Sequence, residues 1–264
     1  MLRFAVVTDI HYGFDRGNKK GSRAPALIDR FIKAANSNRV DFAVDMGDRV
    51  TFTNPAQDRY YLTKLKEQFN KLAMPKYSVH GNHDLSHLTR KDNEEILGLP
   101  GGSYSRDIND HHVIFWNPNV KINGAQGLFI TQDDMDWLRD TLKKTDRKCI
   151  LFTHIPLDNY PADNEAAIEH DKRPFLSYYP QGPDVREILE ESGKVLLCMS
   201  GHRHRNRHRD INGIHYITHQ SLVQRYHNTE RAHAAYSLVQ IKKDRIRIEG
   251  RGLGQPSYDL KAAP

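Results

Sequence analysis

Five apolar stretches of the chain end in aspartate, asparagine or histidine, and this repetition restricts the fold more than any other feature. The stretches cover residues 3–8, 41–46, 76–80, 148–153 and 195–200, and the polar motifs at their ends are TDIH, MGD, GNHD, TH and GHRH. Short apolar runs that alternate with amphipathic stretches are typical of an α/β layered fold. Such folds bind ligands at the carboxyl ends of their strands, so these polar side chains are predicted to converge there.

The rest of the chain supplies helices and a hairpin. The expected strands are residues 3–8, 41–46, 76–80, 112–116, 148–153 and 195–200, and the expected helices are residues 24–38, 56–72, 132–144 and 184–191. Thr131 is the predicted N-cap of the third helix. Asn212-Gly213 is typical of a type I′ turn and predicts a hairpin of residues 207–211 and 214–218. No repeat or linker interrupts the chain, so we expect one domain over residues 1–264, with a flexible tail from about residue 252.

Composition restricts the partners and the compartment. The formal net charge of +6 favours an anionic ligand, because a positive surface concentrates anions. Cys149 and Cys198 lie in apolar runs and are expected to be buried thiols, which fits a reducing compartment. The chain opens on a strand pattern and has no run of roughly 18 apolar residues, so a cytoplasmic protein without a membrane partner is expected.

The side chains at the strand ends suit transition metals. They offer imidazoles, carboxylates and one amide but no thiolate, a set that favours Mn, Fe, Zn or Co. There are too many ligands for one ion, so two ions that share a carboxylate are expected, the usual arrangement for displacement at phosphorus. The candidate ligands are Asp9, His11, Asp48, Asn82, His154, His202 and His204.

The basic run from Ser200 to His219 also allows a nucleic-acid-binding interpretation. Its arginines occupy odd positions from Arg203 to Arg209, and His202 and His204 occupy even ones. An extended chain would turn the two sets to opposite faces. Because four other strand ends also supply potential ligands, we interpret the two histidines as metal ligands and the arginines as solvent-facing or anion-steering groups. The other histidines of this region, His208, His215, His219 and His233, are expected in the hairpin or at the surface.

The ordered motifs D-x-H, GD, GNHD, H and GHxH resemble those of the calcineurin-like metallophosphoesterase superfamily, from about Leu2 to Thr218. The resemblance implies a four-layer α/β fold, a β-sandwich flanked by helices, with two metal ions at the strand ends and a metal-bridging hydroxide as nucleophile. It implies one ion on Asp9, His11 and His204, the other on Asn82, His154 and His202, and Asp48 as the bridge. It also implies that His83 is the proton donor or electrostatic stabiliser beside the leaving oxygen, oriented by Asp84.

Two further resemblances concern the substrate. Residues 132–157 resemble the helix and H-x-P motif of class III cyclic-nucleotide and glycerophosphodiester phosphodiesterases. The GHRHRNRHRDINGIHYIT segment resembles manganese-dependent ADP-ribose and CDP-alcohol diphosphatases. Both groups hydrolyse a phosphate with a substituent on each side. A phosphodiesterase acting on a small phosphate ester, such as a nucleotide, is therefore the leading expectation, with the diphosphatase as an alternative.

Other functions and contacts stay open. A phosphomonoesterase is an alternative because related metal sites accept both ester types. A nuclease is disfavoured because no second DNA-handling domain or aromatic groove is evident, and a scaffold because no motif residue is missing. A homo-oligomer is left open. Basic or aromatic side chains could contact the substrate, and the candidates are Arg49, Tyr160 and Arg225, with Lys19, Lys20 and Arg23 as charged residues of the first loop.

Overall fold

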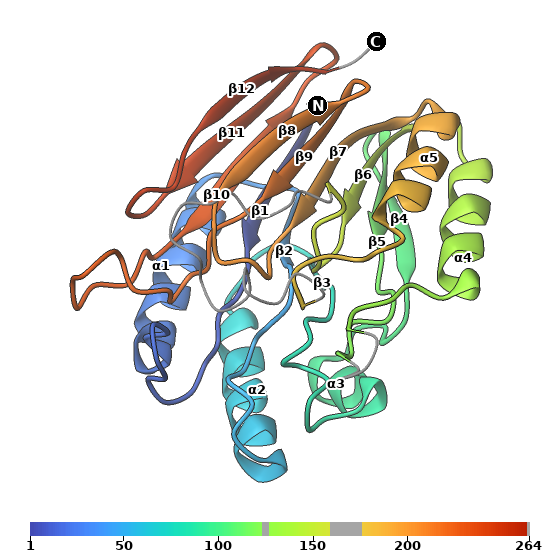
Figure 1. Cartoon of the computed structure of the whole chain (residues 1–264). Helices are drawn as coiled ribbons and strands as arrows, with labels where there is room; N and C mark the ends of the chain where they lie inside the picture. Colours follow the sequence, from blue (N-terminus) through green and yellow to red (C-terminus); the bar gives the residue numbers. More distant parts are fainter. Residues whose placement is uncertain (123–126, 159–175, 263–264) are drawn as a thin grey trace.

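The computed structural model describes residues 1–122, 127–158 and 176–262, which form two six-stranded sheets packed face to face (Figure 1). Phe4 of the first sheet stacks on Phe42 at 5.1 Å and meets Phe152 of the second sheet edge-on at 5.4 Å. Buried apolar residues of both sheets form one cluster around these rings. Helices cover the outer faces, which confirms the expected four-layer α/β fold.

The first sheet has the order β12-β11-β10-β1-β2-β3. Its strands β1, β2 and β3 are parallel, and β10 pairs antiparallel with β1. The strands are β1 (Leu2–Val7), β2 (Phe42–Asp45), β3 (Lys76–Ser78), β10 (Tyr236–Ile241), β11 (Arg245–Arg251) and β12 (Tyr258–Lys261). Helices α1 (Ala24–Ser37) and α2 (Pro55–Phe69) pack against its outer face through a second apolar cluster.

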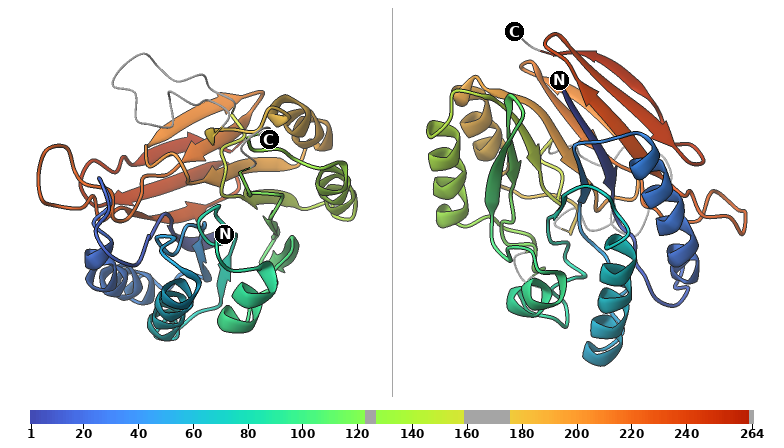
Figure 2. Two further views of the ribbon diagram at one scale, coloured as in Figure 1. Left: turned by 60° about the horizontal axis from the view of Figure 1, so that its bottom comes forward. Right: turned by 180° about the vertical axis from the view of Figure 1, so that it is seen from behind.

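The second sheet has the order β4-β5-β6-β7-β9-β8. Strands β5, β6, β7 and β9 are parallel, so the carboxyl ends of β6 and β7 lie at one edge. The strands are β4 (Tyr104–Ile108), β5 (His111–Phe115), β6 (Lys148–Phe152), β7 (Val195–Ser200), β8 (Arg207–Ile211) and β9 (Ile214–Thr218). Helices α4 (Gln132–Lys143) and α5 (Gly182–Ser192) cover its outer face, on the side away from α1 and α2 (Figure 2).

The predicted elements are present, with small shifts at their ends. Thr131 caps α4 in a capping box, because its side chain accepts from the Asp134 amide and the Asp134 carboxylate accepts from the Thr131 amide. Asn212 and Gly213 both have positive φ, 51° and 82°, as a type I′ turn requires. No sequence signal used above identified β4, α3 (Arg90–Leu97), β10 or β11.

The C-terminal residues and the two cysteines bear on two further expectations. The tail expected to be flexible contains β12, which pairs with β11, so the backbone of residues 258–261 is hydrogen-bonded in a sheet. Cys149 and Cys198 are buried and free, as expected. Within the described residues, no helix has the length and apolar character needed to cross a membrane.

Candidate dinuclear metal centre

The loops after five strands meet at one edge of the sandwich. Asp9 and His11 follow β1, Asp48 follows β2, and Asn82 lies beyond β3. His154 follows β6, and the two histidines of the GHRH motif follow β7. Because β1, β2 and β3 run parallel in one sheet and β6 and β7 run parallel in the other, all seven predicted ligands reach the same region.

Left-handed backbone turns, and not extended strands, aim five of these side chains. The positive φ angles are 51° at Asp9, 41° at His11, 54° at Asp48, 70° at His202 and 51° at His204. Each such residue costs of order 1 kcal/mol and persists only where the surroundings enforce it, which is typical of functional sites. The expectation that the i, i+2 pairs point together because the chain is extended is therefore wrong. The β8 strand begins only after the GHRH motif.

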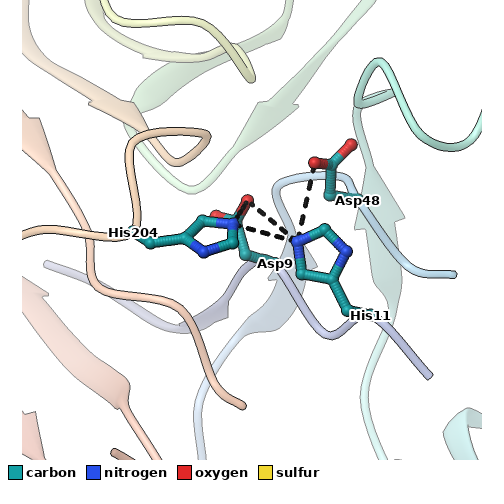
Figure 3. Close-up of side chains that lie close together, drawn as sticks. All are labelled: Asp9, His11, Asp48 and His204. Carbon is teal, nitrogen blue, oxygen red and sulfur yellow. Dashed lines mark hydrogen bonds and ion pairs between the residues drawn. The ribbon is translucent and has the colours of Figure 1, made fainter. Parts of the chain in front are cut away.

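The first group of potential ligands contains Asp9, His11, Asp48 and His204, whose ligand atoms all lie within 4.8 Å of one another (Figure 3). His204 Nε2 is 3.1 Å from Asp9 Oδ1 and 2.9 Å from His11 Nε2. His11 Nε2 is also 3.7 Å from Asp48 Oδ2. The Asp9 carboxylate and the imidazoles of His11 and His204 thus direct their potential ligand atoms toward the space beside Asp48.

The second group contains Asp48, His154 and His202. His154 Nε2 is 3.4 Å from Asp48 Oδ1, and Asn82 Oδ1 is 3.0 Å from His202 Nδ1. Asp48 therefore presents Oδ2 to the first group and Oδ1 to the second. This arrangement is the one that a carboxylate shared by two ions requires.

Three histidines are oriented by the ring nitrogen that points away from the site. His154 Nδ1 donates to the Met46 carbonyl at 2.8 Å, and His204 Nδ1 donates to Gln224 Oε1 at 2.9 Å. His202 Nε2 lies 2.6 Å from the Leu176 carbonyl oxygen. A bond of this kind fixes the tautomer and leaves the other nitrogen of the ring to bind a metal ion. Gln224 belongs to none of the sequence motifs and lies in a turn-rich segment.

Buried acceptor atoms without a partner show that the residues fit metal ions. Among the described residues, neither Asp9 Oδ1 nor His154 Nε2 has a hydrogen-bond partner. By contrast, Asp9 Oδ2 accepts from the Thr8 hydroxyl at 2.8 Å and from the His202 amide at 3.0 Å. Leaving a buried polar atom unpaired costs free energy, which a cation at that position would offset. The chain thus carries the side chains of a two-metal site.

The electrostatic environment keeps Asp48 ionised. Burial alone would raise the pKa of its carboxyl, but the neighbouring His83 and His154 hold that pKa well below its usual range. The backbone at residue 81 can approach the Asp48 carboxylate closely because this residue is glycine, since a Cβ there would lie 2.1 Å from Asp48 Oδ1. An ionised carboxylate in a tight backbone cradle is ready to bind cations on both oxygens.

His83 of the GNHD motif stands at the margin of the two groups. Its Nε2 is 3.8 Å from Asp48 Oδ2, and its ring packs against His11 and Phe52 with centroid distances of 4.6 and 4.7 Å. Burial lowers the pKa of His83 to about 3, although the Asp48 carboxylate opposes the shift. A neutral imidazole at this position can donate a hydrogen bond without adding charge.

Asp84 does not orient His83, contrary to the expectation. Its Oδ2 accepts from the amides of Gly81 at 2.8 Å and Asp48 at 3.0 Å and from Arg49 Nη1 at 2.7 Å, and its Oδ1 accepts from the Arg49 amide at 2.8 Å. The carboxylate is turned away from His83 and joins the GNHD loop to the MGD loop. Asp84 is therefore a positioning residue for Asp48.

The three predicted substrate contacts, Arg49, Tyr160 and Arg225, have different outcomes. Arg49 is fully buried, and its guanidinium donates to Asp45, Asp84 and the Val79 carbonyl, so it is not available to a substrate. Tyr160 lies outside the described residues. The half-buried Arg225 donates its amide to Asn18 O at 2.7 Å, and its role as a substrate contact stays a prediction.

Comparisons with known proteins agree with this geometry. The chain is 20% identical to the manganese-dependent ADP-ribose/CDP-alcohol diphosphatase of Oryza sativa subsp. japonica, over 95% of this chain and 91% of the relative. It is 22% identical to the Arabidopsis thaliana protein of the same description, over 84% and 85%. A dimetal phosphatase structure from Danio rerio shares the fold, with a TM-score of 0.80 and 14% identity over 99% of both chains.

A family model matches most of the chain. The family model described as calcineurin-like phosphoesterase matches residues 2–206, which include all seven predicted ligands and His83. The chain belongs to the calcineurin-like phosphoesterase family.

Proposed function

We propose that the chain is a dinuclear-metal hydrolase of phosphoric esters in which the attacked phosphorus carries a substituent on each side. The observation that carries the proposal is the position of Asp48, whose two oxygens face two separate groups of buried ligands. A pair of ions about 3.5–4 Å apart is the usual apparatus for displacement at phosphorus. Family membership supports the same chemistry.

The roles of the ligands follow from their grouping. One ion would be held by Asp9, His11 and His204, the other would be held by Asn82, His154 and His202, and Asp48 would serve both. Two bound ions supply Lewis acidity at the phosphoryl oxygen and acidify water. The chain itself fixes the geometry, because the Met46 carbonyl and the Gln224 amide hold two of the imidazoles in one tautomer.

His83 acts on the leaving side of the reacting phosphorus. It lies beside Asp48 without belonging to either ligand group, and its ring is held between His11 and Phe52. From this position its N–H contacts the leaving oxygen and stabilises the charge that develops there. The low pKa of His83 favours hydrogen-bond donation by a neutral ring.

A diphosphate is the second candidate substrate. Two curated relatives that match most of this chain are manganese-dependent ADP-ribose/CDP-alcohol diphosphatases. Their substrates also carry a substituent on each side of the attacked phosphorus, so one site geometry serves both candidates. These relatives favour Mn among the ions that the imidazole, carboxylate and amide ligands suit.

A substrate panel tests the proposal. Protein loaded with Mn, Zn, Fe or Co is assayed with bis(p-nitrophenyl) phosphate, ADP-ribose and p-nitrophenyl phosphate, with metal-free protein as control. We expect metal-dependent hydrolysis of the diester or the diphosphate at a higher kcat/KM than the monoester. A monoester rate equal to or above both others with every metal would contradict the proposal.

A further inference from the structure

Lys19 is a cation beside the site that has no carboxylate partner among the residues that the structure describes. Its Nζ lies 3.5 Å from His83 Nε2, and no carboxylate of the described residues lies within 4.0 Å of it. Its loop neighbours differ: Lys20 forms an ion pair with Glu230, and Arg16 stacks over the Phe52 ring at 4.7 Å. Of these three cations, Lys19 is the one held against His83.

The backbone fixes the position of Lys19. The amides and carbonyls of Arg16 and Lys19 exchange hydrogen bonds of 2.9 and 3.0 Å, which close a tight turn. The flanking residues bond to the segment that carries Gln224, through Lys20 N to Val223 O at 2.9 Å and Arg225 N to Asn18 O at 2.7 Å. The loop is thus tied to the segment that carries Gln224, so the backbone from which the Lys19 side chain extends is positioned in advance of substrate binding.

Within the described part of the chain, the charge of Lys19 has no adjacent anion that would compensate it in the proposed enzyme. Burial lowers the pKa of its ammonium, and the more distant carboxylates of Asp48 and Asp9 oppose this shift. In the proposed function those two carboxylates are metal ligands, so their charge is compensated by the ions. A partly buried ammonium without a paired anion is unfavourable, and an anionic ligand removes the cost.

We propose that Lys19 binds a phosphate oxygen of the substrate on the leaving-group side. The inference rests on the proposed function, which places His83 at the leaving oxygen. A hydrogen bond of about 3 Å to His83 Nε2 would put that oxygen no more than about 6.5 Å from Lys19 Nζ. In a diphosphate, the leaving oxygen belongs to a second phosphate, whose other oxygens can lie between His83 Nε2 and Lys19 Nζ. The aryl leaving group of bis(p-nitrophenyl) phosphate presents no anion there. Lys19 therefore selects for substrates whose leaving group is itself a phosphate.

Lys19→Gln, with Lys20→Gln as the matched control, tests the inference in the manganese-loaded protein. We expect Lys19→Gln to retain its metal content, to bind inorganic phosphate about 10- to 100-fold more weakly by calorimetry, and to lose a similar factor in kcat/KM for ADP-ribose. Its kcat/KM for bis(p-nitrophenyl) phosphate should change less than about threefold. Lys19→Arg should recover part of the phosphate affinity, since it restores the charge. Lys20→Gln should match the wild type.

Two results separate this inference from the proposed function. If the wild type hydrolyses the esters but Lys19→Gln keeps wild-type phosphate affinity and wild-type ADP-ribose kinetics, the inference about Lys19 is wrong and the proposed function stands. If the wild type hydrolyses no ester with any metal, the proposed function is wrong. The phosphate affinity of the two variants then still decides whether Lys19 binds anions.

Discussion

Two buried charged clusters adjoin at the successive residues Asp48 and Arg49, and they differ in how their polar atoms are satisfied. In the first, which we call the paired cluster, Asp45, Arg49 and Asp84 bond to one another and to backbone groups, so each carboxylate oxygen and each guanidinium nitrogen has a partner. In the ligand cluster around Asp48, acceptor atoms such as Asp9 Oδ1 and His154 Nε2 have no hydrogen-bond partner among the described residues, although other potential ligands lie close to them. Complete pairing indicates a structural role, and incomplete pairing indicates a site that binds something else.

The sharpest test of the ligand cluster is Asp48→Asn. The substitution removes the charge shared by both ion positions, so we expect kcat/KM to fall by at least about 10³-fold and the bound metal to decrease. An asparagine oxygen can still accept the hydrogen bond from the His83 amide. The free energy of unfolding of the metal-free protein, measured with urea, should therefore stay within about 1 kcal/mol of the wild-type value. Large destabilisation of the metal-free form would mean that Asp48 is structural.

The paired cluster should respond in the opposite way. Arg49→Met leaves the Asp45 and Asp84 carboxylates buried without their cation, and we expect the free energy of unfolding to fall by about 3–5 kcal/mol, measured with urea on metal-free protein. Exposed Arg30 provides the control, because Arg30→Met should change stability by less than about 0.5 kcal/mol. If the Arg49→Met protein kept wild-type stability but failed to bind substrate, Arg49 would be a substrate contact and not a structural residue.

His83 separates catalysis from metal binding within the site. We expect His83→Ala to lower kcat by about 10²- to 10³-fold while metal content stays near normal, because the imidazole acts on the leaving group and is not a ligand. Metal content is measured by elemental analysis alongside steady-state kinetics. Unchanged turnover would show that the leaving oxygen does not need His83, and a loss of metal would make His83 a ligand.

The smallest effect is expected at Gln224, which bonds to the ring nitrogen of His204 that faces away from the site. Gln224→Ala removes the acceptor that orients His204, and we expect metal affinity to fall by about 10- to 100-fold with fold stability retained. Competition with a chelator measures the affinity. At metal concentrations high enough to load the variant, its kcat should approach that of the wild type. A persistent loss of kcat would assign Gln224 a role beyond orientation.

The sequence predicted which side chains come together at the strand ends, but it did not predict their surroundings. The seven ligands and His83 follow from motifs at strand ends, because chemistry limits which side chains can bind a metal ion. Arg49 and Asp84 were misassigned because a charged residue beside a motif carries no local sign of burial. Their mutual contact joins residues 35 positions apart, which no local pattern reveals. Gln224 and the His204 ring meet for the same reason only in the folded chain.

Local sequence alone determined the α/β layering, the hairpin at Asn212-Gly213 and the identity of the metal-binding side chains, because periodicity, turn chemistry and ligand type are properties of short segments. Only the tertiary structure decided how those side chains are aimed. The left-handed φ values of the ligands, such as 70° at His202, are unfavourable in isolation and are imposed by packing and hydrogen bonds between the loops of two sheets. The same long-range contacts placed Lys19 at His83 and Arg49 in the interior, since pairing of distant charges depends on the fold and not on neighbouring residues.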